Sequence, residues 1–309
     1  MARKRLFILG NSYVEYLTNV KRAPERGETV VSSAMHEVMP GGFGMVSSVC
    51  AANLGVDTLL CTRIGDDENG EKLLATLAVC DIDKRFVSVD KRKPTGILSV
   101  ISEEGAKRRT VIYPGANSSL SFEDMEYAFT SYPDAVLMDS SLGEEHVIDA
   151  IKLANKENIP VVFTCGTDIH EFDFTGIGEL EIFVPNKETA FRLTGIEPID
   201  ADTALRTSIK IANLLKCKYV VIKLGDRGAF VYDGTYSKII PARDVDVVDT
   251  AGAGTVFSAS LAAAYLELEN INDAAEFANA ASAFSVSKPG VFTSLPRLED
   301  VKSIFDNSK

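Results

Sequence analysis

The chain has few cysteines, no long apolar run and no low-complexity tract, and each of these absences excludes a class of protein. The cysteines are scattered, with no C-x-x-C pair, at Cys50, Cys61, Cys80, Cys165 and Cys217. This spacing argues against a disulfide framework and against a thiolate metal site. We therefore expect reduced and mostly buried thiols, as in a cytoplasmic protein.

No segment approaches the roughly eighteen consecutive apolar residues that a membrane span requires. The first apolar run, residues 6–9, ends at Gly10 and is too short for the core of a signal peptide. A net charge of −12 argues against a general affinity for nucleic acid or anionic membranes. We expect a cytoplasmic protein without a membrane or nucleic-acid partner, which binds small molecules.

What the sequence does contain is a regular alternation of strand and helix patterns, with no linker rich in proline or serine. The apolar run at residues 6–9 is followed by a turn signal, as is typical of a buried parallel strand. The later elements that we expect are helix 122–130, strand 135–139, helix 144–156, strand 160–164, strand 181–184, helices 187–194 and 201–216, and strand 219–223. This order predicts crossover connections and a largely parallel sheet in one unit, residues 1–309.

Two segments depart from this alternation and predict a small separate sheet. Residues 13–38 alternate polar and β-branched residues, and residues 95–102 and 109–114 have the pattern of a hairpin. We expect residues 12–38 and 95–114 to form a lid over the larger core. The basic cluster at residues 107–109, near the hairpin turn, favours a solvated turn over an anion contact.

A glycine-rich turn, residues 248–257, runs directly into an apolar helical pattern. Gly252 and Gly254 permit positive φ angles and a close approach of the backbone to a ligand. The first N–H groups of the following helix have no acceptor within the helix and attract an anion. The turn therefore predicts a phosphate-binding site, and the alternative is a turn that serves packing only.

A second glycine-rich turn, residues 40–44, leads into another helical pattern. Each turn alone is weak evidence, because a tight connection between a strand and a helix often needs glycine for steric reasons. No Gly-x-Gly-x-x-Gly with a later acidic residue follows the first strand, which argues against a dinucleotide-binding dehydrogenase.

Five motifs in this order resemble those of the ribokinase-like (phosphofructokinase-B) sugar kinase family, and the resemblance covers nearly the whole chain. They are GGFG at 41–44, GAN at 115–117, VPN at 184–186, KLGDRG at 223–228 and DTAGAG at 249–254. The resemblance implies a three-layer α/β/α sandwich with a mostly parallel central sheet and a small β-sheet lid. It also implies transfer of the γ-phosphate of ATP, with Mg²⁺, to a hydroxymethyl group of a sugar or nucleoside.

The resemblance assigns residues to each part of such a site. The ATP site would comprise Asn186, Lys223, Gly225, Gly228 and Asn279, and the anion hole Gly252, Ala253 and Gly254. The substrate side would comprise Tyr13, Glu15, Gly41, Gly42, Phe43 and Val46. Asp249 would be structural or would lie at a monovalent-cation site for K⁺. Lys223 has an alternative interpretation as a solvated charge at the end of a strand.

The chain departs from the family at the position of the catalytic base. In the family, an aspartate that takes the proton of the attacking hydroxyl follows Gly-Ala-Gly, whereas this chain has Thr255. A threonine hydroxyl cannot act as a base near neutral pH, and loss of a general base costs about 10²–10⁴ in rate. We therefore expect inefficient turnover.

A second departure affects the residues that organise Mg²⁺. The family's glutamate three residues after the asparagine is Thr189 here, and Glu188 lies one place earlier. One residue along a helix rotates a side chain by about 100°. We expect Glu188 to be a poor substitute and the metal shell to be altered.

The third departure makes the substrate pocket more apolar. Tyr13 and Glu15 stand where the family has asparagine and aspartate, and Phe43 and Val46 stand where it has lysine and asparagine. A hydroxyl-rich pentose would leave polar groups unpaired, each at a cost of about 1–3 kcal/mol. The pocket therefore favours an aromatic or nucleoside-like ligand, and Glu15 is alternatively a carboxylate on the surface of the lid.

Two functions follow from these observations. The first is a sugar or nucleoside kinase homologue that binds ATP and a small hydroxyl-bearing ligand. The second is a catalytically degenerate regulatory protein that binds ATP or a metabolite and signals through lid closure. The glycine turns favour ATP binding, while Thr255 and Thr189 favour the second function. The resemblance also implies a homodimer formed through the lid.

Overall fold

The computed structural model describes residues 3–32, 34–103, 107–166 and 172–306. Within these residues a nine-stranded sheet has the order β13-β12-β11-β10-β9-β8-β1-β4-β5. Its strands are β1 (Arg5–Leu9), β4 (Asp57–Gly65), β5 (Val87–Asp90), β8 (Ala135–Asp139), β9 (Val161–Thr164), β10 (Leu180–Val184), β11 (Cys217–Gly225), β12 (Gly228–Tyr232) and β13 (Ser237–Ile240). Neighbouring strands are parallel except for β12, which is antiparallel to both β11 and β13.

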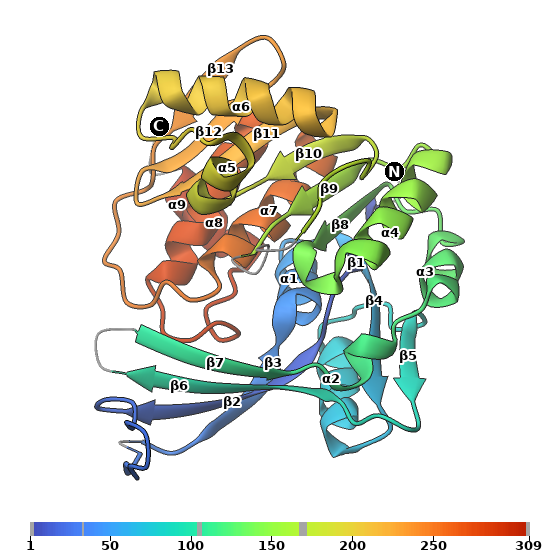
Figure 1. Cartoon of the computed structure of the whole chain (residues 1–309), viewed down its shortest axis with the longest axis vertical. Coiled ribbons are helices and arrows are strands. Elements are labelled where there is room, and N and C mark those ends of the chain that lie inside the picture. Colours follow the sequence, from blue (N-terminus) through green and yellow to red (C-terminus); the bar gives the residue numbers. More distant parts are fainter. Residues whose placement is uncertain (1–2, 33, 104–106, 167–171, 307–309) are drawn as a thin grey trace.

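Strand β1 shows why this sheet is covered on both faces. Successive side chains of a strand point to opposite faces, and here Leu6 and Ile8 enter one apolar core while Phe7 and Leu9 enter the other. One face is covered by α1 (Gly42–Asn53), α2 (Glu68–Val79), α7 (Ala253–Leu268), α8 (Ile271–Val286) and α9 (Leu298–Asp306). The other is covered by α3 (Phe122–Phe129), α4 (Glu144–Lys156), α5 (Lys187–Thr194) and α6 (Ala201–Leu215). The three-layer sandwich expected from the sequence is confirmed (Figure 1).

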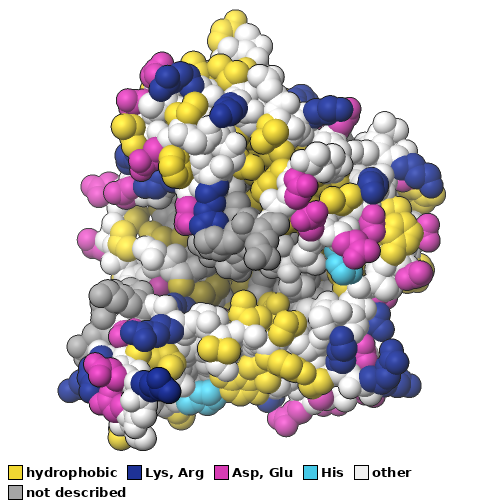
Figure 2. Space-filling view, in the orientation of Figure 1, with side chains coloured by type: hydrophobic (Ala, Val, Ile, Leu, Met, Phe, Trp, Pro, Cys, Tyr) yellow, Lys and Arg dark blue, Asp and Glu magenta, His cyan; other side chains and the backbone are white. Residues whose placement is uncertain are grey.

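A second sheet, which we call the lid sheet, contains β3 (Glu37–Gly41), β2 (Tyr13–Val20), β6 (Gly96–Glu103) and β7 (Lys107–Tyr113) in that order. Strands β2 and β6 are parallel, and the two outer pairs are antiparallel. The lid sheet lies below the large sheet in the view of Figure 1. The surface between the lid sheet and the large sheet is hollowed in Figure 2.

The strands differ from the sequence prediction in two places. Residues 29–36, expected in the small sheet, lie outside any strand where they are described, and Val31 and Met35 are exposed. Strand β5 was not expected; it has only four residues and pairs with β4 alone. Residues 104–106, within the expected hairpin, lie outside the described residues. Among the helices that are described, none is long and apolar enough to cross a bilayer.

Candidate functional site

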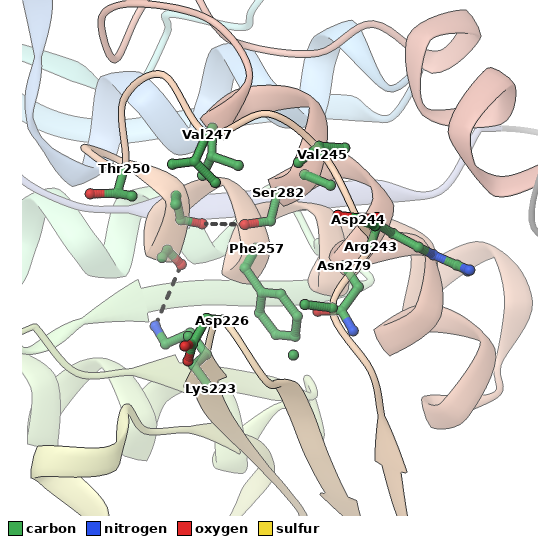
Figure 3. A pocket seen from close by; sticks show the side chains of 17 residues that line it. Lys223, Asp226, Arg243, Asp244, Val245, Val247, Thr250, Phe257, Asn279 and Ser282 are labelled. Atoms are coloured by element: carbon green, nitrogen blue, oxygen red, sulfur yellow. Dashed lines mark hydrogen bonds between the residues drawn. The ribbon is translucent and has the colours of Figure 1, made fainter.

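A cavity of about 490 Å³ lies at the start of α7, where the turn after β11, the loop at 242–250 and α8 meet (Figure 3). Four of the five residues predicted for ATP line it: Lys223, Gly225, Gly228 and Asn279. Ala253 and Gly254 of the predicted anion hole line it as well. Segments far apart in the sequence therefore converge on one cavity. The fifth residue, Asn186, is adjacent to Lys223 through a parallel β-bridge.

The turn before α7 exposes backbone donors to this cavity. Gly252 precedes the helix in the left-handed conformation, with φ +76°, and its carbonyl accepts from the amides of Thr255 and Val256. The N–H of Gly254 has no acceptor among the residues that the structure describes, whereas that of Ala253 lies 3.3 Å from the Thr250 carbonyl. Unpaired amides at a helix N-terminus form an anion site, and Gly254 supplies the clearest one.

Glycine is required at position 252 for two reasons. A positive φ is costly for residues with a side chain, and a Cβ there would lie 2.6 Å from Cγ1 of Val291. Position 254 differs, because its backbone is helical and a Cβ would lie 3.6 Å from Lys223 Nζ, an ordinary contact. Gly252 thus shapes the turn, and Gly254 leaves space next to Lys223.

Lys223 lies beneath the start of α7 with its ammonium held by three acceptors. Nζ donates to Thr164 Oγ1 at 3.0 Å, to Ser258 Oγ at 3.3 Å and to the Gly254 carbonyl at 3.4 Å. Figure 3 shows Lys223 and Ser282 directed at the backbone of this turn from different elements. Desolvation lowers the pKa of Lys223 to about 8, opposed by the negative charge of Asp139. These contacts argue against the alternative interpretation of Lys223 as a solvated charge at the end of a strand.

The wall of the cavity away from this turn is apolar. Phe257 is almost fully buried and lines the cavity together with Val247 and Ala283, and its ring lies between Asn279 and Lys223 in the view of Figure 3. Asn279 donates from Nδ2 to the carbonyls of Ile240 and Pro241, so it anchors the start of the 242–250 loop. The sequence placed Phe257 only on an apolar helix face, a pattern that does not distinguish a cavity wall from a core.

Thr255 occupies the third position of α7, in its first turn, and is partly exposed. No acid lies in the first turn of this helix. Asp249, the nearest acid in the chain before it, has both oxygens engaged: Oδ1 accepts from the Ala251 amide at 3.0 Å and Oδ2 from the Gly290 amide at 3.1 Å. Asp249 is therefore a structural acceptor in this turn rather than a free base.

The residues near Asn186 do not fit a metal held by carboxylates. Asn186 caps α5 by accepting from the Thr189 amide, and the Thr189 side chain is buried. Glu188 is half exposed and pairs with Arg192 one turn later at 2.7 Å, an orientation that the helical rotation predicts. Across the described part of the chain, no group of three metal-ligating side chains was found. This arrangement does not fit Mg²⁺ held directly by protein carboxylates.

The residues predicted for the substrate lie where the lid sheet joins α1. Gly42 has φ +86°, and a Cβ on it would meet the Asn11 carbonyl at 2.6 Å, so the two backbones touch here. Tyr13, Phe43 and Val46 are all buried, and Val46 and Phe43 belong to the core beneath α1. Much of the apolar character expected of this pocket is therefore packing within the protein.

Glu15 lies near Arg108, which the sequence analysis assigned to a solvated turn. Its side chain on β2 is buried, and Oε1 makes no hydrogen bond in the described structure. Arg108 of β7 lies 3.8 Å from that oxygen and 2.5 Å from Oδ2 of Asp249. Burial raises the pKa of Glu15, Arg108 opposes this, and Asp249 adds to it. For Arg108 the expectation of a solvated turn was wrong, and for Glu15 burial excludes a surface carboxylate.

A family model described as pfkB family carbohydrate kinase matches residues 4–298. The chain belongs to this family. Ribokinase of Haemophilus influenzae is 27% identical over 309 residues, which cover 99% of this chain and 100% of that protein. Deoxyribokinase of Salmonella typhi is 26% identical over 294 residues, which cover 94% and 95%. The structure of Arabidopsis thaliana ribokinase complexed with ribose and ATP has a TM-score of 0.87 at 24% identity, covering 99% of each chain.

The pfkB match confirms the resemblance inferred from the five motifs. It extends from the start of β1 to the start of α9 and so includes both sheets. The cavity at α7 and the lid sheet are therefore parts of a pfkB carbohydrate kinase fold.

Proposed function

We propose that this pfkB-family chain binds ATP in the cavity at α7 and a hydroxyl-bearing small molecule beneath the lid sheet, and transfers the γ-phosphoryl group slowly. The observation that carries this proposal is the meeting of an unpaired Gly254 amide with the Lys223 ammonium at one end of the cavity. Phosphoryl transfer depends mainly on positioning and charge stabilisation, which such groups provide. The related Arabidopsis structure, which contains ribose and ATP, supports the same ligand classes.

The two ligands would use different chemistry. Phe257, Val247 and Ala283 give the nucleotide base an apolar wall, and the phosphates extend toward Gly254. Beneath the lid, the buried Oε1 of Glu15 needs a donor, because an unpaired buried acceptor costs about 1–3 kcal/mol. We infer a sugar or nucleoside-like substrate with a hydroxyl group that donates a hydrogen bond to Glu15. The two sheets would act together as a single domain, with the substrate held between them.

Enlarging Gly254 is expected to weaken ATP binding stepwise. Alanine meets Lys223 Nζ at an ordinary distance, so Gly254→Ala should keep the fold and most of the affinity. Valine adds branched methyl groups beside the anion-binding amide and should weaken binding at least about tenfold, or about 1.4 kcal/mol. Isothermal titration with ATP measures both variants, and thermal unfolding checks their fold. Equal affinity of the valine variant and the wild type would contradict the phosphate position.

A second function is favoured by the absence of a carboxylate in the first turn of α7. In a regulatory protein of this fold, ligand binding and lid closure would be the output and turnover would be unnecessary. Phosphoryl transfer by the wild type to D-ribose, 2-deoxy-D-ribose and adenosine distinguishes the two. Turnover at ordinary kinase rates, about 1–100 s⁻¹, would exclude the regulatory function.

We also propose a homodimer through the lid sheet. The exposed large apolar side chains of the lid and its β2–β3 connection include Val31, Met35, Val38 and Val111. A lid sheet that carries several exposed large apolar side chains is a candidate association surface. Sedimentation analysis should show a dimer that Val111→Asp dissociates; a monomer at every concentration of the wild type would exclude it.

A further inference from the structure

The guanidinium of Arg108 joins the lid sheet to the phosphate-binding turn. Arg108 lies near the start of β7, and Figure 1 shows this end of β7 beneath the loop that leads from β13 into α7. Its Nη2 donates to Oδ2 of Asp249 at 2.5 Å, and its Nη1 lies 3.8 Å from Oε1 of Glu15. The side chain is only 20% exposed, against 65% for the neighbouring Arg109. One residue of the lid thus neutralises carboxylates from two different elements.

Asp249 is the residue through which this contact reaches the turn. Its Oδ1 accepts from the amide of Ala251 and its Oδ2 from that of Gly290. These bonds fix the backbone just before Gly252, whose left-handed conformation starts α7. The geometry of the Gly254 donor therefore depends on the Asp249 carboxylate keeping its position.

The contacts of Asp249 do not fit the monovalent-cation site that the family resemblance implied. K⁺ requires oxygen ligands, yet the partners of this carboxylate are two amide N–H groups and a guanidinium. The guanidinium already supplies one positive charge at hydrogen-bond distance from Oδ2. A second cation at the same oxygen would be repelled by the first.

We propose that Arg108 is a positioning residue that takes the place of a monovalent cation at Asp249 and orders the phosphate-binding turn when the lid sheet is closed. Without its charge, the Glu15 and Asp249 carboxylates would lose the cation that both of them approach, and the repulsion between the two like charges would disfavour the closed lid. The inference deepens the proposed function, since an ordered turn holds the phosphate, but the order of the turn is measurable without ATP.

Hydrogen–deuterium exchange of the ligand-free full chain tests the inference. The peptide covering residues 249–256 should exchange slowly at its hydrogen-bonded amides, which exclude that of Gly254, in the wild type with choline chloride as the only salt, and KCl should change this little. In Arg108→Ala it should exchange at least about tenfold faster, because opening a local segment becomes easier. KCl should restore part of the protection, because the vacated carboxylate can then accept a cation. Arg109→Ala, an equal charge loss on the same strand where the arginine pairs with Glu103, should resemble the wild type.

Three results would overturn the proposal. The first is that residues 249–256 of Arg108→Ala exchange as slowly as those of the wild type. The second is that the same residues of the wild type are protected only when KCl is present. The third, lost protection that KCl does not restore, would overturn the replacement of the cation. If the alanine variant does not fold, Arg108→Lys provides the same test: a retained charge without the guanidinium fork should give intermediate protection. ATP titration of the same proteins separates this inference from the proposed function, since a wild type with an ordered turn that fails to bind ATP contradicts only the latter.

Discussion

Replacing Thr255 with aspartate is expected to raise the rate of phosphoryl transfer about 10²–10⁴-fold, the range over which a positioned general base acts. Position 255 lies in the first turn of α7, immediately after the Gly254 amide that we assign to the phosphate. An aspartate there could take the proton of the attacking hydroxyl. A carboxylate in the first turn of a helix also interacts favourably with the helix dipole, so the variant should fold.

The matched control is Thr255→Asn, which has the shape of the aspartate without its ability to accept a proton at neutral pH. We expect its rate to equal that of the wild type and the ATP affinity of all three proteins to be similar. Transfer from ATP to D-ribose, 2-deoxy-D-ribose and adenosine provides the assay. An aspartate variant that is no faster than the wild type on every acceptor would show that the missing base is not what limits turnover.

Replacing Lys223 with methionine is expected to weaken ATP binding about ten- to a hundred-fold. The substitution removes the ammonium that reaches the Gly254 carbonyl while keeping most of the apolar length of the side chain. A hydrogen bond to a charged group contributes about 1.5–3 kcal/mol, which corresponds to this range of affinity. Isothermal titration at neutral pH measures the change, and an affinity equal to that of the wild type would place the phosphates elsewhere.

The pKa of Lys223 predicts how this affinity varies with pH. Because desolvation lowers that pKa to about 8, the ammonium loses its proton as the pH rises through 8, and phosphate affinity should fall. The affinity of Lys223→Met should change less over the same interval. The stability of the ligand-free protein should move in the opposite direction. The folded pKa lies below the unfolded value of 10.5, so the unfolded chain binds more protons between these values and stability rises with pH relative to the variant.

Equal pH profiles of affinity in the wild type and in Lys223→Met would contradict this account. Urea unfolding at neutral pH and at pH near 9 supplies the stability comparison. Comparison with Lys223→Met isolates the contribution of Lys223, because every other titrating group is common to the two proteins.

The large sheet could be predicted because its pattern is local. The continuous apolar run of β1 is buried on both faces, and a strand of that kind needs no knowledge of its neighbours to be identified. Strand β5 was missed for the opposite reason. Its four residues include an exposed Val89, and only pairing with β4 makes the segment a strand.

The candidate site likewise contains some residues that the sequence could predict and others that it could not. Gly252 marks the anion turn because its positive φ favours glycine, and Gly254, two residues later, lines the cavity. The role of Arg108 could not be read from its neighbours in sequence, since its partner Asp249 lies 141 residues away. Phe257 was hidden for a related reason, because the same apolar periodicity serves a helix core and a cavity wall.

A crystal structure of the chain with a nonhydrolysable ATP analogue tests the central claim most directly. We expect the nucleotide base against Phe257 and the terminal phosphate within hydrogen-bond distance of the Gly254 amide, with the Lys223 ammonium beside it and no carboxylate from position 255. A nucleotide bound elsewhere, or a terminal phosphate that contacts neither Gly254 nor Lys223, would contradict the account.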